Sequence, residues 1–196
     1  MLLLASGSAT RLSLLRAANL DVEAALPRVD EEAVKDALLA EGHGPRAVAA
    51  ALAEMKAAKV AARRGDALVL GCDQTLDLDG ALVSKAADMA EARARLLALR
   101  ARAHVLHAAA VLFEGGRPVW RHVGRAQVTF RAFSEDFLDG YLDRNRDAAL
   151  GSVGGYHVEG EGARLIERID GDHFAVLGLP LLPLLSFLAA RGSIPG

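Results

Sequence analysis

The first residues of the chain combine a short apolar run, a turn of small residues and an arginine. Residues 2–5 are typical of a buried strand, and Ser6-Gly7-Ser8 follows as a turn before apolar helical spacing begins. Backbone N–H groups at a strand-to-helix turn lack partners, and the helix dipole favours anions there. The guanidinium of Arg11 adds a planar fork that suits phosphate oxygens. The segment therefore predicts a site for a phosphorylated ligand.

Carboxylates occur at two places where a metal site could form. Asp73 follows the apolar run 67–72, at the expected end of a buried strand, where open α/β sheets build their clefts. Asp30-Glu31-Glu32 opens a predicted helix. One or two of these three residues with Asp73 could hold Mg²⁺, which uses few carboxylates together with substrate phosphates. Two simpler interpretations stay open, because the triplet also suits helix capping and Asp73 also suits a strand-end turn.

Lysines form a second group of candidate residues. Lys56 and Lys59 are three residues apart on a predicted helix and share a face, and Lys85 follows a predicted hairpin. Lysines on protein surfaces are usually only solvated, so none of the three indicates a site by itself. Together with Arg11 they would form a convergent basic set that faces a polyphosphate.

Several other kinds of site are disfavoured by the sequence. The chain has no GxxxxGK[ST] and no GxGxxG pattern, so neither a P-loop nor a Rossmann fingerprint is present. His104 and His107 are an odd number of residues apart on a predicted strand and would point to opposite faces, which favours structural roles over zinc binding. Cys72 lies in an apolar strand and is expected to be inert packing rather than a nucleophile.

Length and composition indicate one domain over residues 1–196 with a sizeable core, since 52% of the residues are hydrophobic. Lys and Arg number 23 against 25 Asp and Glu, a balance that argues against a nucleic-acid polymer as partner. The N-terminus lacks the basic segment of a signal peptide, and the apolar stretch 177–190 is too short and too rich in proline to span a bilayer. One cysteine excludes an intrachain disulfide. We therefore expect a cytoplasmic protein with no membrane partner.

The elements that must position these residues alternate between strands and helices. Apolar runs bounded by turn signals predict strands over residues 2–5, 22–26, 67–72, 104–113 and 119–130, a hairpin over 76–83, and glycine-punctuated strands over 153–168. Helical spacing and capping residues predict helices over residues 10–18, 30–42, 45–64, 88–99, 134–142 and 181–190. This pattern indicates an α/β fold with a mixed, partly antiparallel twisted sheet and flanking helices.

The opening segments resemble the Maf family of nucleoside triphosphate pyrophosphatases. Leu4-Ala-Ser-Gly-Ser8 followed by Arg11 is similar to the family's LASxSxxR motif. The Pro-Arg that usually precedes the motif's arginine is here Ala9-Thr10. Asp30-Glu31 matches the acidic pair that follows the family's first hairpin.

Later motifs of the family occur in the same order along the chain. Leu52-Ala-Glu-Met-Lys-Ala57 is similar to the family's LAxxKA, which selects Lys56 over Lys59. Gly71-Cys-Asp-Gln74 falls on the motif that bears the catalytic aspartate and selects Asp73, and Lys85 matches the lysine of a KP motif whose proline is here alanine. Three further segments complete the set: Gly154-Gly-Tyr-His-Val-Glu-Gly160, Ile169-Asp-Gly-Asp172 and Leu177-Gly-Leu-Pro180.

This resemblance implies an elongated cleft between two lobes, a homodimer, and a divalent cation, Mg²⁺ or Mn²⁺. It also implies cleavage of a nucleoside triphosphate between the α- and β-phosphates, which yields a nucleoside monophosphate and pyrophosphate. Asp73 would be the general base for the attacking water and, with Glu31, a metal ligand. Five further residues would bind the phosphates or neutralise their charge: Ser6, Ser8, Arg11, Lys56 and Lys85.

The base of the substrate divides the family into enzymes for dTTP and UTP and enzymes for 7-methyl-GTP. The first group typically has Thr after the catalytic Asp and Gln before the glycine of the later motif, where this chain has Gln74 and Glu159. A carboxylate at Glu159 suits the donor edge and positive ring of a methylated guanine, so we expect a 7-methyl-GTP-like substrate. Thr10 departs from the bulky residue that the family has before its arginine. A dTTP or UTP pyrophosphatase is the alternative, and a non-catalytic nucleotide-binding regulator of cell division is the alternative of another class.

Overall fold

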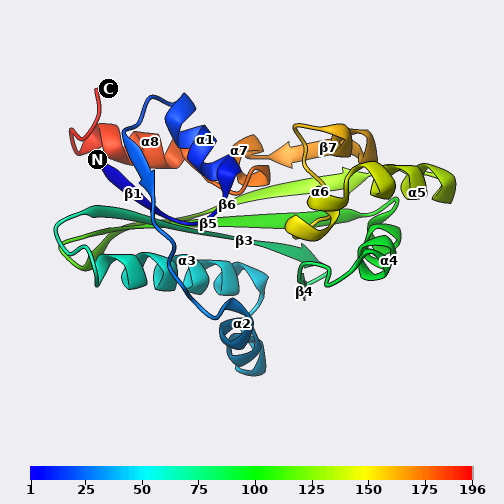
Figure 1. The fold of residues 1–196 in the computed structure, drawn as a ribbon, viewed down its shortest axis with the longest axis horizontal. Helices are drawn as coiled ribbons and strands as arrows, with labels where there is room; N and C mark the ends of the chain where they lie inside the picture. The colour runs from blue at the N-terminus through cyan, green and yellow to red at the C-terminus, as the bar shows by residue number, and fades with distance from the viewer. Residues whose placement is uncertain (196) are drawn as a thin grey trace.

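The computed structural model describes residues 1–195 and has one mixed sheet at its centre (Figure 1). The strands are β1 (Leu2–Ala5), β2 (Val22–Ala24), β3 (Leu68–Leu78), β4 (Ala81–Val83), β5 (Ala103–Glu114), β6 (Arg117–Phe130) and β7 (Ile166–Gly171). Their order in space is β2-β1-β3-β5-β6-β7, and β4 pairs with β3. β1 is parallel to β2 and β3, whereas the other pairings are antiparallel. The predicted mixed sheet is therefore confirmed.

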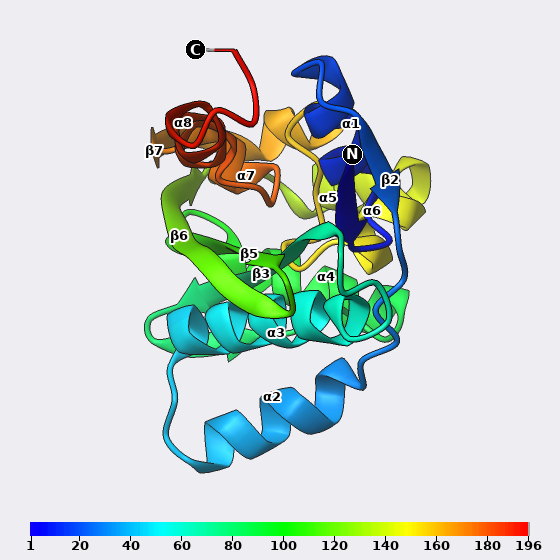
Figure 2. The same ribbon diagram turned by 90° about the vertical axis from the view of Figure 1, so that its left-hand side faces the viewer.

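Helices cover both faces of the sheet and one of its ends. They are α1 (Ala9–Ala17), α2 (Glu31–Ala40), α3 (Pro45–Ala61), α4 (Met89–Leu99), α5 (Glu135–Arg144), α6 (Arg146–Gly151), α7 (His173–Val176) and α8 (Leu181–Ala190), with a 3₁₀ turn, η1 (Glu161–Leu165). Figures 1 and 2 show α3 along one face, with α2 beyond it, and α1, α7 and α8 on the opposite face. Among residues 1–195, no helix has the length and apolar character needed to cross a membrane.

The contact between α3 and β3 is unusually close because small residues meet there. A Cβ atom added at Gly71 would lie 2.1 Å from the carbonyl oxygen of Ala53 and 2.6 Å from the backbone nitrogen of Ala57. Ala53 and Ala57 are fully buried in the cluster between α3 and the sheet. The backbones of helix and strand can approach this far only where side chains are absent or minimal. Asp73 lies two residues beyond Gly71 and so emerges on the same face of β3, toward α3.

Large apolar residues secure the opposite face and the far end of the sheet. Leu15 of α1 and Leu184 of α8 pack against Leu70 of β3 in one buried cluster. At the far end, Phe130 of β6 and Tyr156 pack with α4 and α5 in a second cluster. These clusters hold the chain before and after the sheet against it, so the turns that follow β1 and precede α8 have rigid supports.

The predicted end of the strand before Asp73 is wrong. β3 continues to Leu78, because antiparallel β5 pairs with it from Val69 through Asp77. The strand that does end here is β1, whose last residue, Ala5, pairs with Gly71. The chain leaves β1 beside Asp73. Space next to Asp73 therefore lies at the carboxyl end of β1 and not beyond the end of β3.

The strands predicted over residues 153–168 are also largely wrong. Residues 153–160 contain no strand, η1 follows, and only β7 from Ile166 onward joins the sheet. Gly155 has a φ of 74°, and the Tyr141 hydroxyl donates a hydrogen bond of 3.0 Å to its carbonyl oxygen, which shapes this segment as an irregular loop. The short helices α6 and α7 were not predicted, since four to six residues carry little periodicity.

Replacement of Gly71 by alanine tests the close contact between α3 and β3. The new methyl group would collide with backbone atoms of α3, so we expect the free energy of unfolding to fall by about 3 kcal/mol or more. Gly65→Ala is the matched control, because the nearest atom to its added Cβ would be 3.9 Å away. Urea denaturation of both variants measures the effect. Equal stabilities for Gly71→Ala and Gly65→Ala would contradict this account of the contact.

Candidate active site

A cleft of about 600 Å³ opens beside the carboxyl end of β1. Its walls come from the turn after β1, the segment that enters α2 and the first turns of that helix, α3, the centre of β3, the segment after β4, the loop after α6, and the end of α7. The ten residues predicted for the site all line it: Ser6, Ser8, Thr10, Arg11, Glu31, Lys56, Asp73, Gln74, Lys85 and Glu159. The fold therefore gathers into one cavity residues that are spread over most of the chain.

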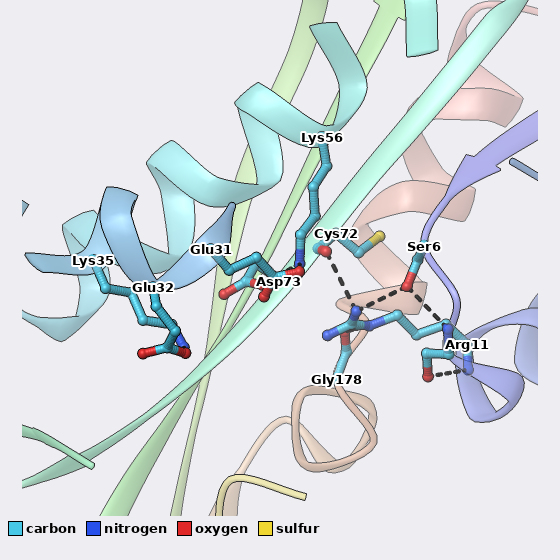
Figure 3. Close-up of polar contacts among 10 residues, drawn as sticks. Ser6, Arg11, Glu31, Glu32, Lys35, Lys56, Cys72, Asp73 and Gly178 are labelled. Atoms are coloured by element: carbon cyan, nitrogen blue, oxygen red, sulfur yellow. Dashed lines mark hydrogen bonds and ion pairs between the residues drawn. The ribbon is translucent and has the colours of Figure 1, made fainter. Parts of the chain in front are cut away.

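A buried lysine joins two carboxylates at the centre of the cleft. Lys56 Nζ donates to Asp73 Oδ1 at 2.6 Å and lies 2.7 Å from Glu31 Oε1. Lys56 and Asp73 are each only 5% exposed, whereas Glu31 is partly open to solvent. Figure 3 shows the lysine descending from α3 to the two carboxylates, one from β3 and one from the start of α2. A buried charge needs such partners, because an isolated one is costly.

The environments of the two carboxylates move their pKa values in opposite directions. Burial raises the pKa of Asp73, and the charges of Lys56 and Arg11 only partly offset that effect. Burial also disfavours ionisation of Glu31, but the hydrogen bond and charge of Lys56 outweigh it and hold the pKa of Glu31 below its usual value. Asp73 is thus the better proton acceptor near neutral pH, and Glu31 is the more firmly ionised group.

Arg11 is fixed by three hydrogen bonds to separate parts of the chain. Its Nε donates to the Gly178 carbonyl oxygen at 2.7 Å, and its Nη1 donates to Ser6 Oγ at 3.1 Å and to the Cys72 carbonyl oxygen at 3.3 Å (Figure 3). Gly178 has a φ of 85°, and a Cβ there would approach Arg11 Nε to 3.2 Å. The guanidinium is therefore held rigidly at the cleft wall.

The turn after β1 is organised by its own serines. Ser8 caps α1, and its Oγ accepts a hydrogen bond of 3.3 Å from the backbone nitrogen of Arg11. Ser6 is buried, and its Oγ accepts from the Ser8 backbone nitrogen at 3.2 Å as well as from Arg11. The predicted strand, turn and helix start are thus confirmed as local structure.

Part of the cleft lining is more exposed to solvent and consists of Thr10, Gln74, Lys85 and Glu159. The side-chain amide nitrogen of Gln74 donates to the carbonyl oxygens of Ala175 and Val176, at 2.8 and 3.0 Å, which ties β3 to α7. Lys85 and Glu159 are exposed, and Thr10 is partly exposed. All four belong to the lining of the same cleft.

Several other candidate residues have structural roles or are solvated and take no part in the central cluster. Asp30 caps α2 by accepting from the Ala33 backbone nitrogen, and exposed Glu32 pairs with Lys35 at 2.8 Å, so Glu31 alone of the acidic triplet reaches the cluster. Lys59 is exposed and does not line the cleft. Burial raises the pKa of the Cys72 thiol to about 11, which keeps it protonated and inert.

The two histidines of β5 have separate partners. His104 Nε2 is 2.9 Å from the Tyr156 hydroxyl, and His107 Nε2 is 3.3 Å from Asp77 Oδ2. Within residues 1–195, no group of three or more His, Cys, Asp or Glu side chains is arranged to hold a metal ion. Lys56 engages Oδ1 of Asp73 and Oε1 of Glu31, which leaves the second oxygen of each carboxylate for Mg²⁺, a cation commonly held by one or two carboxylates together with substrate phosphates. The pair therefore fits such a cation.

Two basic residues of the cleft were not predicted from the sequence. Arg28 lies in the segment between β2 and α2, and Lys35 lies one turn into α2. Lys35 lies four residues after Glu31 and so on the same face of the helix. This spacing is visible in the sequence and could have identified Lys35. No comparable signal marks Arg28, because the path of an irregular segment depends on what it packs against.

Comparison with known proteins gives a consistent result over the whole chain. Residues 1–191 match the model of the family described as "Maf-like protein". A protein of Ruegeria pomeroyi named "Nucleoside triphosphate pyrophosphatase" is 53% identical over 98% of this chain and 97% of its own length. A protein of Caulobacter vibrioides with the same name is 51% identical over 97% and 96%. A protein of Mesorhizobium japonicum named "7-methyl-GTP pyrophosphatase" is 50% identical over 100% and 98%.

Replacement of Lys56 by methionine tests the central cluster. Ionised Asp73 would become a buried charge without its cation, so we expect the free energy of unfolding at pH 8 to fall by about 3 kcal/mol. The folded-state pKa of Asp73 would then rise further above that of the unfolded chain. Protonation removes the unpaired charge, so part of the lost stability should return as the pH is lowered to 5.

Urea denaturation at both pH values measures this effect. Lys59→Met, on the same helix but exposed, is the matched control and should match the parent protein at each pH. A deficit of Lys56→Met that is the same at pH 8 and pH 5 would mean that lost packing, rather than lost charge compensation, is responsible.

Proposed function

Because the chain belongs to the Maf-like protein family, we propose that it is a hydrolase, a nucleoside triphosphate pyrophosphatase. The proposed reaction splits a nucleoside triphosphate between its α- and β-phosphates and releases a nucleoside monophosphate and pyrophosphate. The observation that carries the proposal is the central cluster, in which Asp73, Lys56 and Glu31 meet in a cleft beside a fixed arginine. A base for the attacking water and several cations that neutralise the phosphates are the parts that hydrolysis of a phosphoanhydride requires.

Asp73 is proposed as the general base. It would accept a proton from the water whose oxygen forms the new bond to the α-phosphorus, while the bond from the α-phosphorus to the oxygen that bridges to the β-phosphate breaks. The pyrophosphate leaves with the electron pair of that bond. Burial raises the pKa of Asp73 toward the pH at which a base works best. Lys56, at 2.6 Å, keeps the carboxylate oriented.

Arg11, Lys56 and Lys85 are proposed to neutralise the triphosphate and the charge that develops on the leaving group. Arg11 needs no rearrangement, since its hydrogen bonds already fix it at the wall. The hydroxyl groups of Ser6 and Ser8 would donate hydrogen bonds to phosphate oxygens. Glu31 and Asp73 would hold Mg²⁺ or Mn²⁺, which, when bound, supplies further neutralisation of the phosphates.

The proposed substrate has a 7-methylguanine base. Glu159 is an exposed carboxylate in the cleft lining, and an anion there favours a base that has N–H donors and a positive ring. Gln74 and Thr10 would complete the base pocket. A relative that is 50% identical over the whole chain has the name 7-methyl-GTP pyrophosphatase, which supports the same choice. A dTTP or UTP pyrophosphatase on this scaffold is the alternative.

A nucleotide-binding regulator without turnover is disfavoured, because such a protein would have no need to keep a base and a shared cation buried together. Two further features belong to the proposal. A cytoplasmic location is supported by a single, buried cysteine, which suits a reducing compartment. A homodimer is supported by the resemblance to the family.

Pyrophosphate release from 7-methyl-GTP, GTP, dTTP and UTP tests the proposed function. With Mg²⁺ or Mn²⁺ we expect turnover, fastest for 7-methyl-GTP, and we expect loss of turnover when the cation is removed by a chelator. Asp73→Asn should lower the rate by about 10²–10⁴-fold and largely retain substrate binding, because only the proton acceptor is lost.

Three results would count against parts of this proposal. Faster turnover of dTTP than of 7-methyl-GTP would reject the assigned base, and binding without turnover of any substrate would favour the regulator. A near-parental rate for Asp73→Asn would mean that another group is the base.

Replacement of Glu159 by glutamine tests base recognition. The amide keeps the shape of the side chain but removes its charge, so we expect the ratio of kcat/KM for 7-methyl-GTP to that for UTP to fall by about 10–100-fold. Glu161→Gln is a control in the same region, since Glu161 pairs with Arg144 and does not line the cleft. An unchanged ratio in Glu159→Gln would remove Glu159 from base recognition.

A further inference from the structure

The cleft contains cationic side chains of two kinds, those already paired within the protein and those left free. Three are engaged: Lys56 with two carboxylates, Lys35 with Glu32, and Arg11 with Ser6 and two carbonyl oxygens. Within residues 1–195, neither Arg28 nor Lys85 has a side-chain hydrogen bond or ion pair. Lys85 already has a role in the proposed function, which leaves Arg28 as the unexplained cation.

The backbone of Arg28 is in a conformation that side chains disfavour. Its φ is +51°, in the left-handed region. Three other residues that are not glycine share this region: Asn19, Asp79 and Ala101. Asn and Asp tolerate it well, but for arginine it is strained. Arg28 is also the one member of this group that lines the cleft. Strained residues of this kind concentrate at ligand sites, where surrounding contacts enforce them.

The segment that bears Arg28 is anchored from outside the cleft. Arg63, two residues beyond the end of α3, donates from Nη2 to the Leu26 carbonyl oxygen at 3.2 Å and to the Pro27 carbonyl oxygen at 3.4 Å. Pro27 is buried, and its ring fixes its own φ. The strained backbone at Arg28 is therefore imposed by its neighbours, and its position relative to α3 is set by a hydrogen-bonded connection.

We propose that Arg28 binds the two phosphates that leave as pyrophosphate. This inference rests on the proposed function, because the triphosphate substrate is what brings those two phosphates into the cleft. The α-phosphate must lie beside Asp73, where Lys56 and Arg11 already supply positive charge. The free guanidinium of Arg28 is therefore left to the phosphates farther along the chain. Its planar fork binds two phosphate oxygens at once. The opposite end of the substrate, with a positive base, would repel it.

Three variants test this role. Arg28→Gly removes the guanidinium and relieves the backbone strain, Arg28→Lys keeps the charge but loses the fork, and Ala101→Gly relieves strain at a left-handed residue outside the cleft. For each we would measure the inhibition constants of inorganic pyrophosphate and of the nucleoside monophosphate product, the kcat/KM for 7-methyl-GTP, and the melting temperature. Calorimetric titration with inorganic pyrophosphate gives the same affinity without turnover.

For Arg28→Gly we expect pyrophosphate binding to weaken by about 10–100-fold, with a similar loss of kcat/KM, because one charge-assisted contact is removed. Binding of the monophosphate should stay within twofold, and the melting temperature should equal or exceed that of the parent protein. The pyrophosphate affinity of Arg28→Lys should lie between those of Arg28→Gly and the parent protein. Ala101→Gly should leave all binding and kinetic constants unchanged.

Other results would overturn the assignment. Weaker monophosphate binding in Arg28→Gly would place the guanidinium on the nucleoside or the α-phosphate, and unchanged pyrophosphate binding would leave Arg28 a solvent-exposed residue. If the parent protein released no pyrophosphate from any nucleotide, the proposed function would fail. The calorimetric titration would still test Arg28 independently, and a parent protein that bound no pyrophosphate would reject its role.

Discussion

The cleft depends on one ammonium group, that of Lys56, which neutralises Asp73 and Glu31 together. Its position follows from a steric condition elsewhere, the absence of a side chain at Gly71. The backbones of β3 and α3 nearly touch at Gly71. Lys56, less than one helical turn after Ala53, can therefore reach Asp73, two residues beyond Gly71. A wider spacing between helix and strand would leave Asp73 buried without its cation, which proteins seldom tolerate.

The same ammonium group also fixes an element that has little other support. None of the residues of α2 is buried, and the helix packs on α3 with its first residue directed to the centre of the cleft. The contact from Glu31 to Lys56 therefore links a peripheral helix to the core of the sheet. Opposite it, Arg11 links the first turn of the chain to the segment before α8 through Gly178. The two sides of the cleft are thus held by charged groups that face its interior, where an anionic substrate would meet them already oriented.

The sequence was informative where a residue's role follows from its neighbours. The turn after β1, the cap of α2 and the hairpin between β3 and β4 were all predictable, because turn and cap chemistry is local. Sequence reasoning erred where pairing partners decide the outcome. β3 extends through Asp73 because β5 offers it a partner, and the segment 153–160 stays irregular because Tyr156 anchors it on Phe130 at the end of the sheet. Such contacts join residues far apart in the chain and have no local signal.

The candidate residues themselves could be chosen from the sequence, since residue types together with the resemblance to the Maf family selected ten side chains that all line one cleft. The sequence did not determine which of these groups pair with one another, which stay unpaired, or how their pKa values shift. Only the tertiary structure decided that Lys56 is shared by two carboxylates, that Asp73 and Glu31 have pKa values displaced in opposite directions, and that Arg28 stands unpaired on a strained backbone. The physical reason is that burial and charge separation are properties of distances in space, which spacing along the chain cannot specify.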